Sequence, residues 1–343
     1  MKVLVAMSGG VDSSVAALLA RDAGHEVVGA TMKLWGGVSD SGCCSVSDVD
    51  DARRVASKIG IDHHVFNFTE EFQDAVVNHY VESYSRGLTP NPCIECNRNV
   101  KFDIFIDRAI RLGFDMVATG HYARVSNQGG RFSLSRGLDE IKDQSYVISM
   151  LDQERLSRLM LPIGEMHKSR VREIAAAGGL MTASKPDSQD VCFIASTTSR
   201  VEFLSARVAL HSGRVVDSKS RAIIGEVPAI ESITIGQRRG LGTMGDSARR
   251  YVVGVDHQSG EVVLGSLQET YTDEIAFGTP TYVWDPPLLG SEVLCQMSSH
   301  GKTQKGRFFP GRIVFDEPVR KVAPGQTIVF YSGSEVLGAG VVA

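Results

Sequence analysis

The opening segment of this 343-residue chain constrains its fold more than any other feature. An uninterrupted apolar run, Val3–Met7, is followed at once by SGGVDSS (residues 8–14), and apolar residues then recur at helical spacing from Val15. A continuous apolar run is typical of a strand that is covered on both faces. A strand that passes through glycines directly into a helix predicts a parallel sheet of the α/β class.

The first 125 residues continue this alternation of strand and helix patterns. We expect further strands at 27–32, 64–68 and 116–119, and helices at 50–59, 70–84 and about 100–112. Helical patterns then continue through 153–161 and 169–177. The interpretation is a doubly wound parallel sheet, which binds ligands at the carboxyl ends of its strands.

After Phe193 the pattern changes to short strands separated by turns. From about Thr279, β-branched residues dominate and prolines and glycines interrupt the apolar runs. We therefore predict three domains: an α/β domain over residues 1–198, a small β-rich central domain over 199–275, and a C-terminal β-barrel over 276–343.

Charge and cysteine content exclude some functions. Lys and Arg number 36 against 40 Asp and Glu, a net charge of −4, which excludes a protein that coats nucleic acid by bulk charge. Recognition of a folded RNA through local patches is compatible with it. The first apolar run is too short for a signal peptide, so we expect a cytoplasmic protein. Its six cysteines are then reduced, and catalysis or metal binding explains them better than a disulfide framework.

The SGGVDSS loop has the chemistry of a phosphate site. Its glycines let backbone N–H groups approach an anion, and the helix N-terminus and serine hydroxyls add donors. The loop lacks the lysine of a Walker-A motif and is not GxGxxG. It resembles the signature of the ATP pyrophosphatases, which cleave ATP to AMP and pyrophosphate. That resemblance implies ATP contacts from Ala6, Met7, Ser8, Gly9, Gly10, Val11, Asp12, Ser13, Met32 (on the adenine) and Gly120, with Asp12 helping to hold Mg²⁺.

Two cysteine segments are the second informative feature. Two prolines and two cysteines share TPNPCIECN (residues 89–97), and we expect Cys96 just before a helix whose N-terminus favours the thiolate. Cys192 lies in DSQDVCFI (residues 187–194). Neither thiol is decisive alone, because most cytosolic cysteines are buried and inert.

Together these motifs resemble the tRNA-specific 2-thiouridylases over nearly the whole chain. The shared segments also include ATGHYAR (118–124), KDQSY (142–146), TIGQRRGLG (234–242) and PGQ (324–326). The resemblance implies an ATP-dependent sulfurtransferase that makes 2-thiouridine at the tRNA wobble position. It also implies that residues 1–198 are the ATP-pyrophosphatase catalytic domain and that the central domain, 199–275, binds tRNA. It implies the lysine, glutamate and glutamine tRNAs as substrates, and a sulfur donor such as a cysteine desulfurase or a sulfur-relay protein.

The resemblance also assigns residues. Cys192 would carry the sulfur as a persulfide, and Cys96 would release it while closing a Cys96–Cys192 disulfide. Contacts to the target base or to tRNA would come from Asn91, Pro92, Cys93, His121, Lys142, Asp143, Gln144 and Gln326. Many relatives have Asp at the position of Cys93, so the acid–base role is either vacant here or falls to His121, Asp187 or the substrate. This chain also has no arginine near Ser299–Gly301, where relatives often have an Arg-Tyr pair.

Other readings of the cysteines remain open. Cys93, Cys96 and Cys192 could hold an iron–sulfur cluster that binds the transferred sulfur, whereas the favoured route uses no metal there. Cys43 and Cys44 could join Cys93 and Cys96 in a structural zinc site. A different ATP-pyrophosphatase ligase would need no paired thiols, and a non-catalytic RNA-binding or sulfur-carrier protein would release no pyrophosphate.

Overall fold

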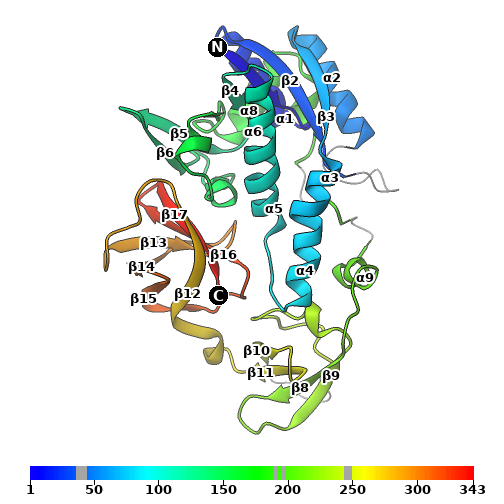
Figure 1. Ribbon diagram of the computed structural model, residues 1–343, viewed down its shortest axis with the longest axis vertical. Helices are drawn as coiled ribbons and strands as arrows, with labels where there is room; N and C mark the ends of the chain where they lie inside the picture. Colours follow the sequence, from blue (N-terminus) through cyan, green and yellow to red (C-terminus); the bar gives the residue numbers. More distant parts are fainter. Residues whose placement is uncertain (36–44, 188–191, 195–197, 243–248) are drawn as a thin grey trace.

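The protein is described by a computed structural model that covers residues 1–35, 45–187, 192–194, 198–242 and 249–343. Cys43 and Cys44 lie outside the described residues. Figure 1 shows a parallel-sheet domain at the N-terminus, a barrel beside its helices and a small β-rich domain at the far end. Among the described residues, no helix is both long and apolar enough to cross a membrane.

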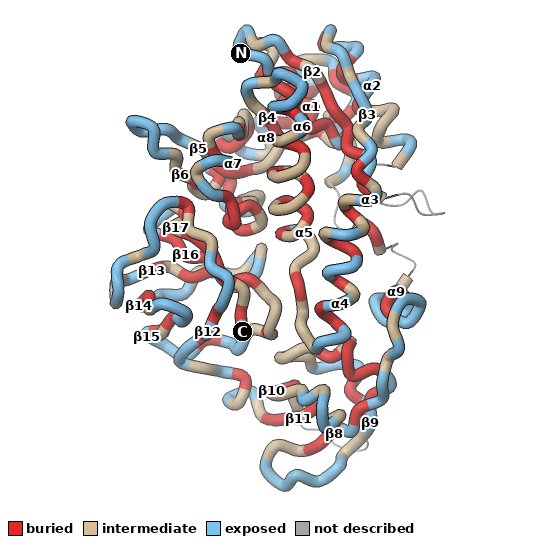
Figure 2. Tube along the Cα trace, viewed as in Figure 1, coloured by how far each residue is buried: buried red, intermediate tan, exposed pale blue. Residues whose placement is uncertain are grey.

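The N-terminal domain is built on the predicted parallel sheet, whose strand order is β3-β2-β1-β4-β7. Its strands are β1 (Lys2–Ala6), β2 (Glu26–Lys33), β3 (Asp62–Asn67), β4 (Met116–Ala118) and β7 (Leu159–Met160). Alternate residues of β1 pack into different clusters: Val3 and Val5 on one face, Leu4 and Ala6 on the other. The continuous apolar run therefore reflects burial on both faces, as predicted, and Figure 2 shows the buried residues along these inner strands.

Helices cover both faces of this sheet. The cluster that contains Val3 and Val5 also takes residues of α1 (Val11–Asp22), α2 (Val46–Ile59) and α8 (Lys168–Ala177). The opposite cluster takes two long helical segments, each interrupted by a π-helical stretch. They are α3 (Thr69–Phe72), η1 (Gln73–Asn78) and α4 (His79–Ser85), then α5 (Pro92–Glu95), η2 (Cys96–Ile104) and α6 (Phe105–Arg111).

Two parts of this domain differ from the prediction. The expected helical run at 153–161 is only α7 (Gln153–Leu156), after which β7 joins the sheet edge beside β4. The hairpin of β5 (Ala123–Gln128) and β6 (Arg131–Arg136) was not expected, and it extends the C-terminal sheet through β17. The short 3-10 helices η3 (Ser145–Ile148) and η4 (Met181–Ser184) complete the domain.

The central and C-terminal domains are both β-rich, as expected. The central sheet has the order β10-β11-β8-β9 and its own small core. It contains β8 (Gly213–Asp217), β9 (Ile223–Val227), β10 (Tyr251–Asp256) and β11 (Glu261–Gly265), with α9 (Arg200–Ser205) and the 3-10 turns η5 (Ile230–Ser232) and η6 (Gln268–Thr270).

The last six strands form a closed antiparallel barrel, because β12 pairs with both β15 and β17. They are β12 (Tyr271–Tyr282), β13 (Glu292–Gln296), β14 (Gln304–Phe309), β15 (Arg312–Arg320), β16 (Thr327–Ser332) and β17 (Glu335–Val342). One side of the barrel packs into the N-terminal core, and the buried hydroxyl of Tyr146 donates to the carbonyl of Thr327 (2.8 Å). The barrel is therefore attached directly to the parallel-sheet domain.

Candidate active site

The loop after β1 is shaped for close approach of an anion. Gly9 has φ +73°, and a Cβ there would lie 2.3 Å from the carbonyl oxygen of Asp48, so glycine is required. Gly10 is the N-cap of α1 and has no side chain to cap the first turn. The amides of that turn therefore face the position where a phosphate would sit.

Serine hydroxyls hold this loop in shape. The N–H of Ser8 donates to Oγ of Ser13 (3.1 Å), and the hydroxyls of Ser13 and Ser14 donate to the carbonyl of Gly10 (3.1 and 2.8 Å). Gly120 packs on the start of α1, because a Cβ on it would lie 2.6 Å from the nitrogen of Ser13. The structure thus brings Gly120 to the loop with which the sequence associated it.

A network of ion pairs lies beside this loop. The carboxylate of Asp12 accepts from the hydroxyl of Tyr122 (2.7 Å) and from Nζ of Lys168 (2.8 Å to each oxygen). Lys168 also pairs with Asp187 (2.8 Å), which in turn pairs with Lys142 (2.7 Å). The network therefore joins the loop after β1 to Asp187, five positions before Cys192 in the sequence.

Sequence reasoning missed most of the cations of this site. Lys168 and Arg172 lie on α8, and Arg172 donates to Asp187 (3.0 Å). Lys185 donates to the carbonyl of Gly9 (3.1 Å) and to the carboxylates of Asp48 and Asp51. The only sequence signal for α8 was its helical periodicity. That signal does not show which carboxylates its cations would contact.

The two residues proposed for acid–base work are held in fixed charge states. Burial, aided by the charge of Lys101, lowers the pKa of His121 to about 3, and its Nδ1 shares a hydrogen bond with the hydroxyl of Thr119 (2.8 Å). Burial acts to raise the pKa of Asp187, but hydrogen bonds from Lys142 and Lys168 outweigh it and set the pKa at about 2. Near neutral pH, His121 is a neutral imidazole and Asp187 an anion.

The first cysteine segment differs from the prediction in where its helix begins. The side chain of Asn91 caps the helix, accepting from the N–H groups of Cys93 (3.1 Å) and Ile94 (3.4 Å), and Pro92 occupies the first turn. Cys96 is therefore inside the helical segment, at the start of η2, rather than just before a helix. Cys93 is the thiol of the first turn.

The two candidate catalytic thiols meet the same apolar cluster. Cys96 is buried within it, and the half-buried Cys192 packs against it. The ring of Phe193, the residue after Cys192, lies 5.3 Å from the ring of Tyr80 and 5.9 Å from that of Phe72. Aromatic contacts to α3 and α4 thus anchor Phe193, the residue next to Cys192.

The described cysteines are not grouped as a ligand set for a metal cluster. Across the described part of the chain, which includes Cys93, Cys96 and Cys192, no three His, Cys, Asp or Glu side chains are grouped to hold a metal. Among the described residues, these three thiols are therefore not arranged as the iron–sulfur alternative would require. The zinc alternative depends on Cys43 and Cys44, which are outside the described residues.

Two of the residues expected to contact tRNA are held by other parts of the protein. Asp143 and Gln144 have internal partners: the carboxylate of Asp143 is 5% exposed and accepts from Arg136 (2.8 Å), and Oε1 of Gln144 accepts from the N–H of Tyr122 (3.0 Å). Between Asp139 and Lys142, the side chain of Ile141 is 84% exposed. Asp143 and Gln144 therefore fix an exposed loop beside the ion-pair network.

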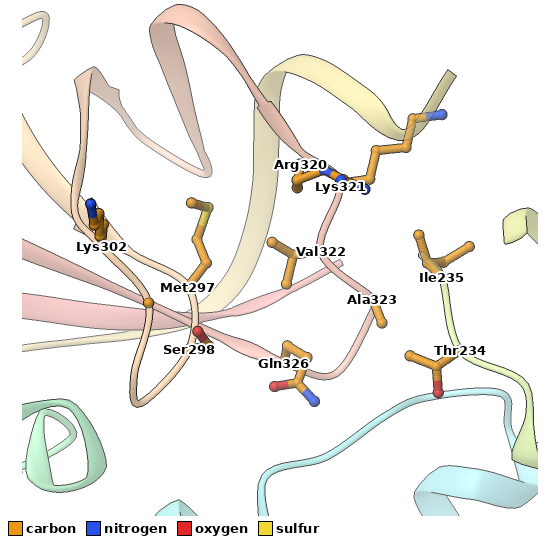
Figure 3. Close-up of a pocket in the computed structure, with 11 residues that line it drawn as sticks. Thr234, Ile235, Met297, Ser298, Lys302, Arg320, Lys321, Val322, Ala323 and Gln326 are labelled. Carbon is orange, nitrogen blue, oxygen red and sulfur yellow. The ribbon is translucent and has the colours of Figure 1, made fainter. Parts of the chain in front are cut away.

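Gln326 lies in a cleft of about 340 Å³ between the barrel and the central domain (Figure 3). Thr234 and Ile235 line it from the central domain, and Lys302 and Lys321 line it from the barrel. Within the described ranges neither lysine forms an ion pair, so the cleft presents positive charge. Such a cleft suits the phosphates of an RNA.

Arg320, which also lines the cleft, has a structural role there. Its guanidinium lies 5.1 Å from the ring centre of Tyr271 and 5.6 Å from that of Tyr251, and it donates to the hydroxyl of Thr270 (3.2 Å). Arg320 therefore ties the barrel to the central domain.

Comparison with known proteins gives consistent matches along the whole chain. Three family models match: a tRNA methyl transferase HUP domain over residues 1–196, a tRNA methyl transferase PRC-barrel domain over 201–266 and an aminomethyltransferase beta-barrel domain over 275–342. A tRNA-specific 2-thiouridylase MnmA of Carboxydothermus hydrogenoformans is 43% identical, covering 99% of this chain and 97% of that protein. The protein of the same name from Mycobacteroides abscessus is also 43% identical, covering 100% of this chain and 99% of that protein.

A solved structure of a U34-tRNA thiolase NcsA from Methanococcus maripaludis, with its [4Fe-4S] cluster, is more distant. It is 17% identical, with a TM-score of 0.38, and the match covers 60% of this chain and 63% of that chain.

Proposed function

The chain belongs to the MnmA family of tRNA-specific 2-thiouridylases, and on that premise we propose how its residues thiolate the wobble uridine of tRNA. The uracil 2-carbonyl oxygen attacks the α-phosphorus of ATP, the bond to the bridging oxygen breaks, and pyrophosphate leaves. The adenylated oxygen can then depart with AMP. The loop from Ala6 to Ser13 holds the phosphates, Met32 packs on the adenine, and Gly120 lies beside the nucleotide.

Two thiols carry the sulfur. Cys192 receives it from a donor protein as a persulfide, and the terminal sulfur attacks the activated ring carbon while AMP leaves. The thiolate of Cys96 then attacks Sγ of Cys192, and the sulfur–sulfur bond breaks with its electron pair passing to the transferred sulfur. The products are 2-thiouridine and a Cys96–Cys192 disulfide, which a thiol reductant reopens with two electrons.

One observation carries this proposal: Lys168 links Asp12 of the nucleotide loop to Asp187, which lies in the segment of Cys192. Asp187 and Cys192 are five positions apart in the sequence, so these contacts support a position for Cys192 near the loop that would hold ATP. A thiol and an adenylated carbonyl must meet for sulfur transfer, and this contact supports their proximity.

The remaining groups bind and position the substrates. Asn91, Pro92 and Cys93 surround the target base, and the tRNA is held by His121, by the loop of Lys142, Asp143 and Gln144, and by Gln326. We expect the lysine, glutamate and glutamine tRNAs, and a cysteine desulfurase or sulfur-relay protein as donor. Mg²⁺ bound with ATP would neutralise phosphate charge, and Asp12 is the carboxylate of the loop that would hold it.

The test is a thiolation assay with ATP, Mg²⁺, a persulfide donor and unmodified tRNA. We expect ATP-dependent thiolated uridine by mass spectrometry, which also separates thiolation from methylation. Cys96→Ser and Cys192→Ser should abolish the product. Cys295→Ser is the matched control, because Cys295 is buried in the barrel and burial raises its pKa to about 12. Thiolation that survives Cys192→Ser would refute the assigned carrier.

A further inference from the structure

Lys168 is the most enclosed cation of the network beside the nucleotide loop. Its side chain is 12% exposed, against 37% for Lys142 and 33% for Arg172. Nζ lies 2.8 Å from both oxygens of Asp12 and 2.8 Å from one oxygen of Asp187. An ammonium group has three donors, and two of these three contacts go to a single carboxylate.

The partners of Lys168 can tolerate a change in its contacts. Asp187 retains Lys142 and Arg172 if Lys168 turns to another anion, and Asp12 retains the hydroxyl of Tyr122. One contact from Lys168 is enough to keep Asp12 paired. Lys168 can therefore give one donor to a new anion without leaving a half-buried carboxylate unpaired, which would be costly.

The position of Lys168 indicates which anion this is. Asp12 lies in the first turn of α1, whose uncapped amides follow Gly9 and Gly10. An anion that binds these amides comes next to Nζ of Lys168, because Nζ contacts the side chain of the same turn. The positive end of the helix and the buried ammonium thus converge on one place.

We propose that Lys168 is a catalytic residue that binds the pyrophosphate end of ATP and stabilises that group as it leaves. This rests on the proposed function, and it assigns the leaving-group cation of the site. When the carbonyl oxygen of uridine attacks the α-phosphorus, the bridging oxygen takes the electron pair of the breaking bond. A fixed ammonium beside it lowers the energy of this charge, and no proton needs to move.

The experiment measures binding of inorganic pyrophosphate and of AMP by calorimetry, each with Mg²⁺. Lys168→Met should weaken pyrophosphate binding about 10- to 100-fold, the usual effect of losing one hydrogen bond to a charged group, and change AMP binding less than about twofold. Lys58→Met is the control, since Lys58 is exposed in the last turn of α2, and it should change neither. Unchanged pyrophosphate binding in Lys168→Met, or an equal loss for AMP, would overturn the proposal.

Loss of Lys168 leaves Asp12 with one fewer partner, so a second variant guards against misfolding. Asp12→Asn combined with Lys168→Met leaves no unpaired carboxylate at this position and should still bind pyrophosphate weakly. Restored binding in the double variant would contradict the assignment. The wild-type thiolation assay is independent of these measurements: if it fails, the function is wrong, whereas unaltered pyrophosphate binding with normal thiolation refutes only the role of Lys168.

Discussion

The side-chain amide of Gln326 donates a hydrogen bond to the carbonyl of Thr89 (2.8 Å), joining positions 237 residues apart. The N–H of Thr89 in turn donates to the carbonyl of Pro324 (2.7 Å). The turn between β15 and β16 thus holds the segment that leads into Asn91 and α5. The C-terminal domain therefore supports the position of the thiol-bearing segment as well as lining the basic cleft.

Gly325→Ala should loosen this contact. Gly325 has φ +89°, and a Cβ would lie 2.9 Å from the nitrogen of Thr89. Gly290→Ala is the matched control, because Gly290 has φ +75° with nothing within 4 Å of the added Cβ. Both variants carry the strain of a left-handed alanine, about 1–2 kcal/mol, and Gly325→Ala should lose a further ~1–2 kcal/mol in urea unfolding. Equal losses would show that the contact does not stabilise the fold.

Gly120→Ala should impair ATP use. Its Cβ would meet the nitrogen of Ser13 at 2.6 Å and displace the first turn of α1. We expect the KM for ATP to rise about tenfold or more, because phosphate donors must be placed within tenths of an ångström. Gly278→Ala, in β12 with open space around the added Cβ, should leave it unchanged. If the KM for ATP in Gly120→Ala equals that of the wild type, the nucleotide does not bind beside Gly120.

His121→Asn should flatten the acid side of the stability profile. The pKa of His121 is about 3 in the folded protein because its surroundings desolvate the charged ring, and about 6.5 when unfolded. Between these values the unfolded chain binds a proton that the folded chain does not, so stability falls as pH drops from 6.5 towards 3. One such proton contributes a slope of up to about 1.4 kcal/mol per pH unit. Urea unfolding of both proteins between pH 6.5 and 4 measures this slope; identical slopes would contradict the lowered pKa of His121.

Lys302→Ala and Lys321→Ala should each weaken tRNA binding and make it less salt-dependent. If each lysine meets one phosphate, the slope of log affinity against log salt falls by about one for each substitution. Lys305→Ala is the control, since Lys305 is 65% exposed on β14 and lies 3.8 Å from Glu292. Anisotropy titrations with labelled tRNA at several salt concentrations decide the matter, and three indistinguishable slopes would exclude the cleft from the RNA interface.

Local patterns sufficed for much of the fold. The apolar run of β1, its glycine turn and the alternation that follows predicted the parallel sheet, because each of these signals depends on neighbours within about ten residues. The β5–β6 hairpin was missed because its strands are short and polar on one side and β6 extends a sheet from the other end of the chain. Ser133 on β6 bonds Glu335 on β17 across 202 residues, a pairing that no local pattern encodes.

The sequence likewise predicted some parts of the candidate site and missed others. The glycine loop and both cysteine segments could be recognised, since glycines and thiols have chemistry that their neighbours in sequence reveal. The helix start was misplaced because the cap of Asn91 and the proline after it were read as a stiff loop. Lys168 was missed because its role depends on contacts with two carboxylates, which lie 156 residues before it and 19 residues after it in the sequence.

A single turnover without reductant tests the central claim most directly. Wild-type protein bearing a labelled persulfide on Cys192 is mixed with ATP, Mg²⁺ and unmodified tRNA, and both products are quantified by mass spectrometry. We predict one labelled 2-thiouridine for each Cys96–Cys192 disulfide formed, and no further turnover until a thiol reductant is added. Labelled 2-thiouridine formed while Cys96 and Cys192 both remain reduced would contradict it.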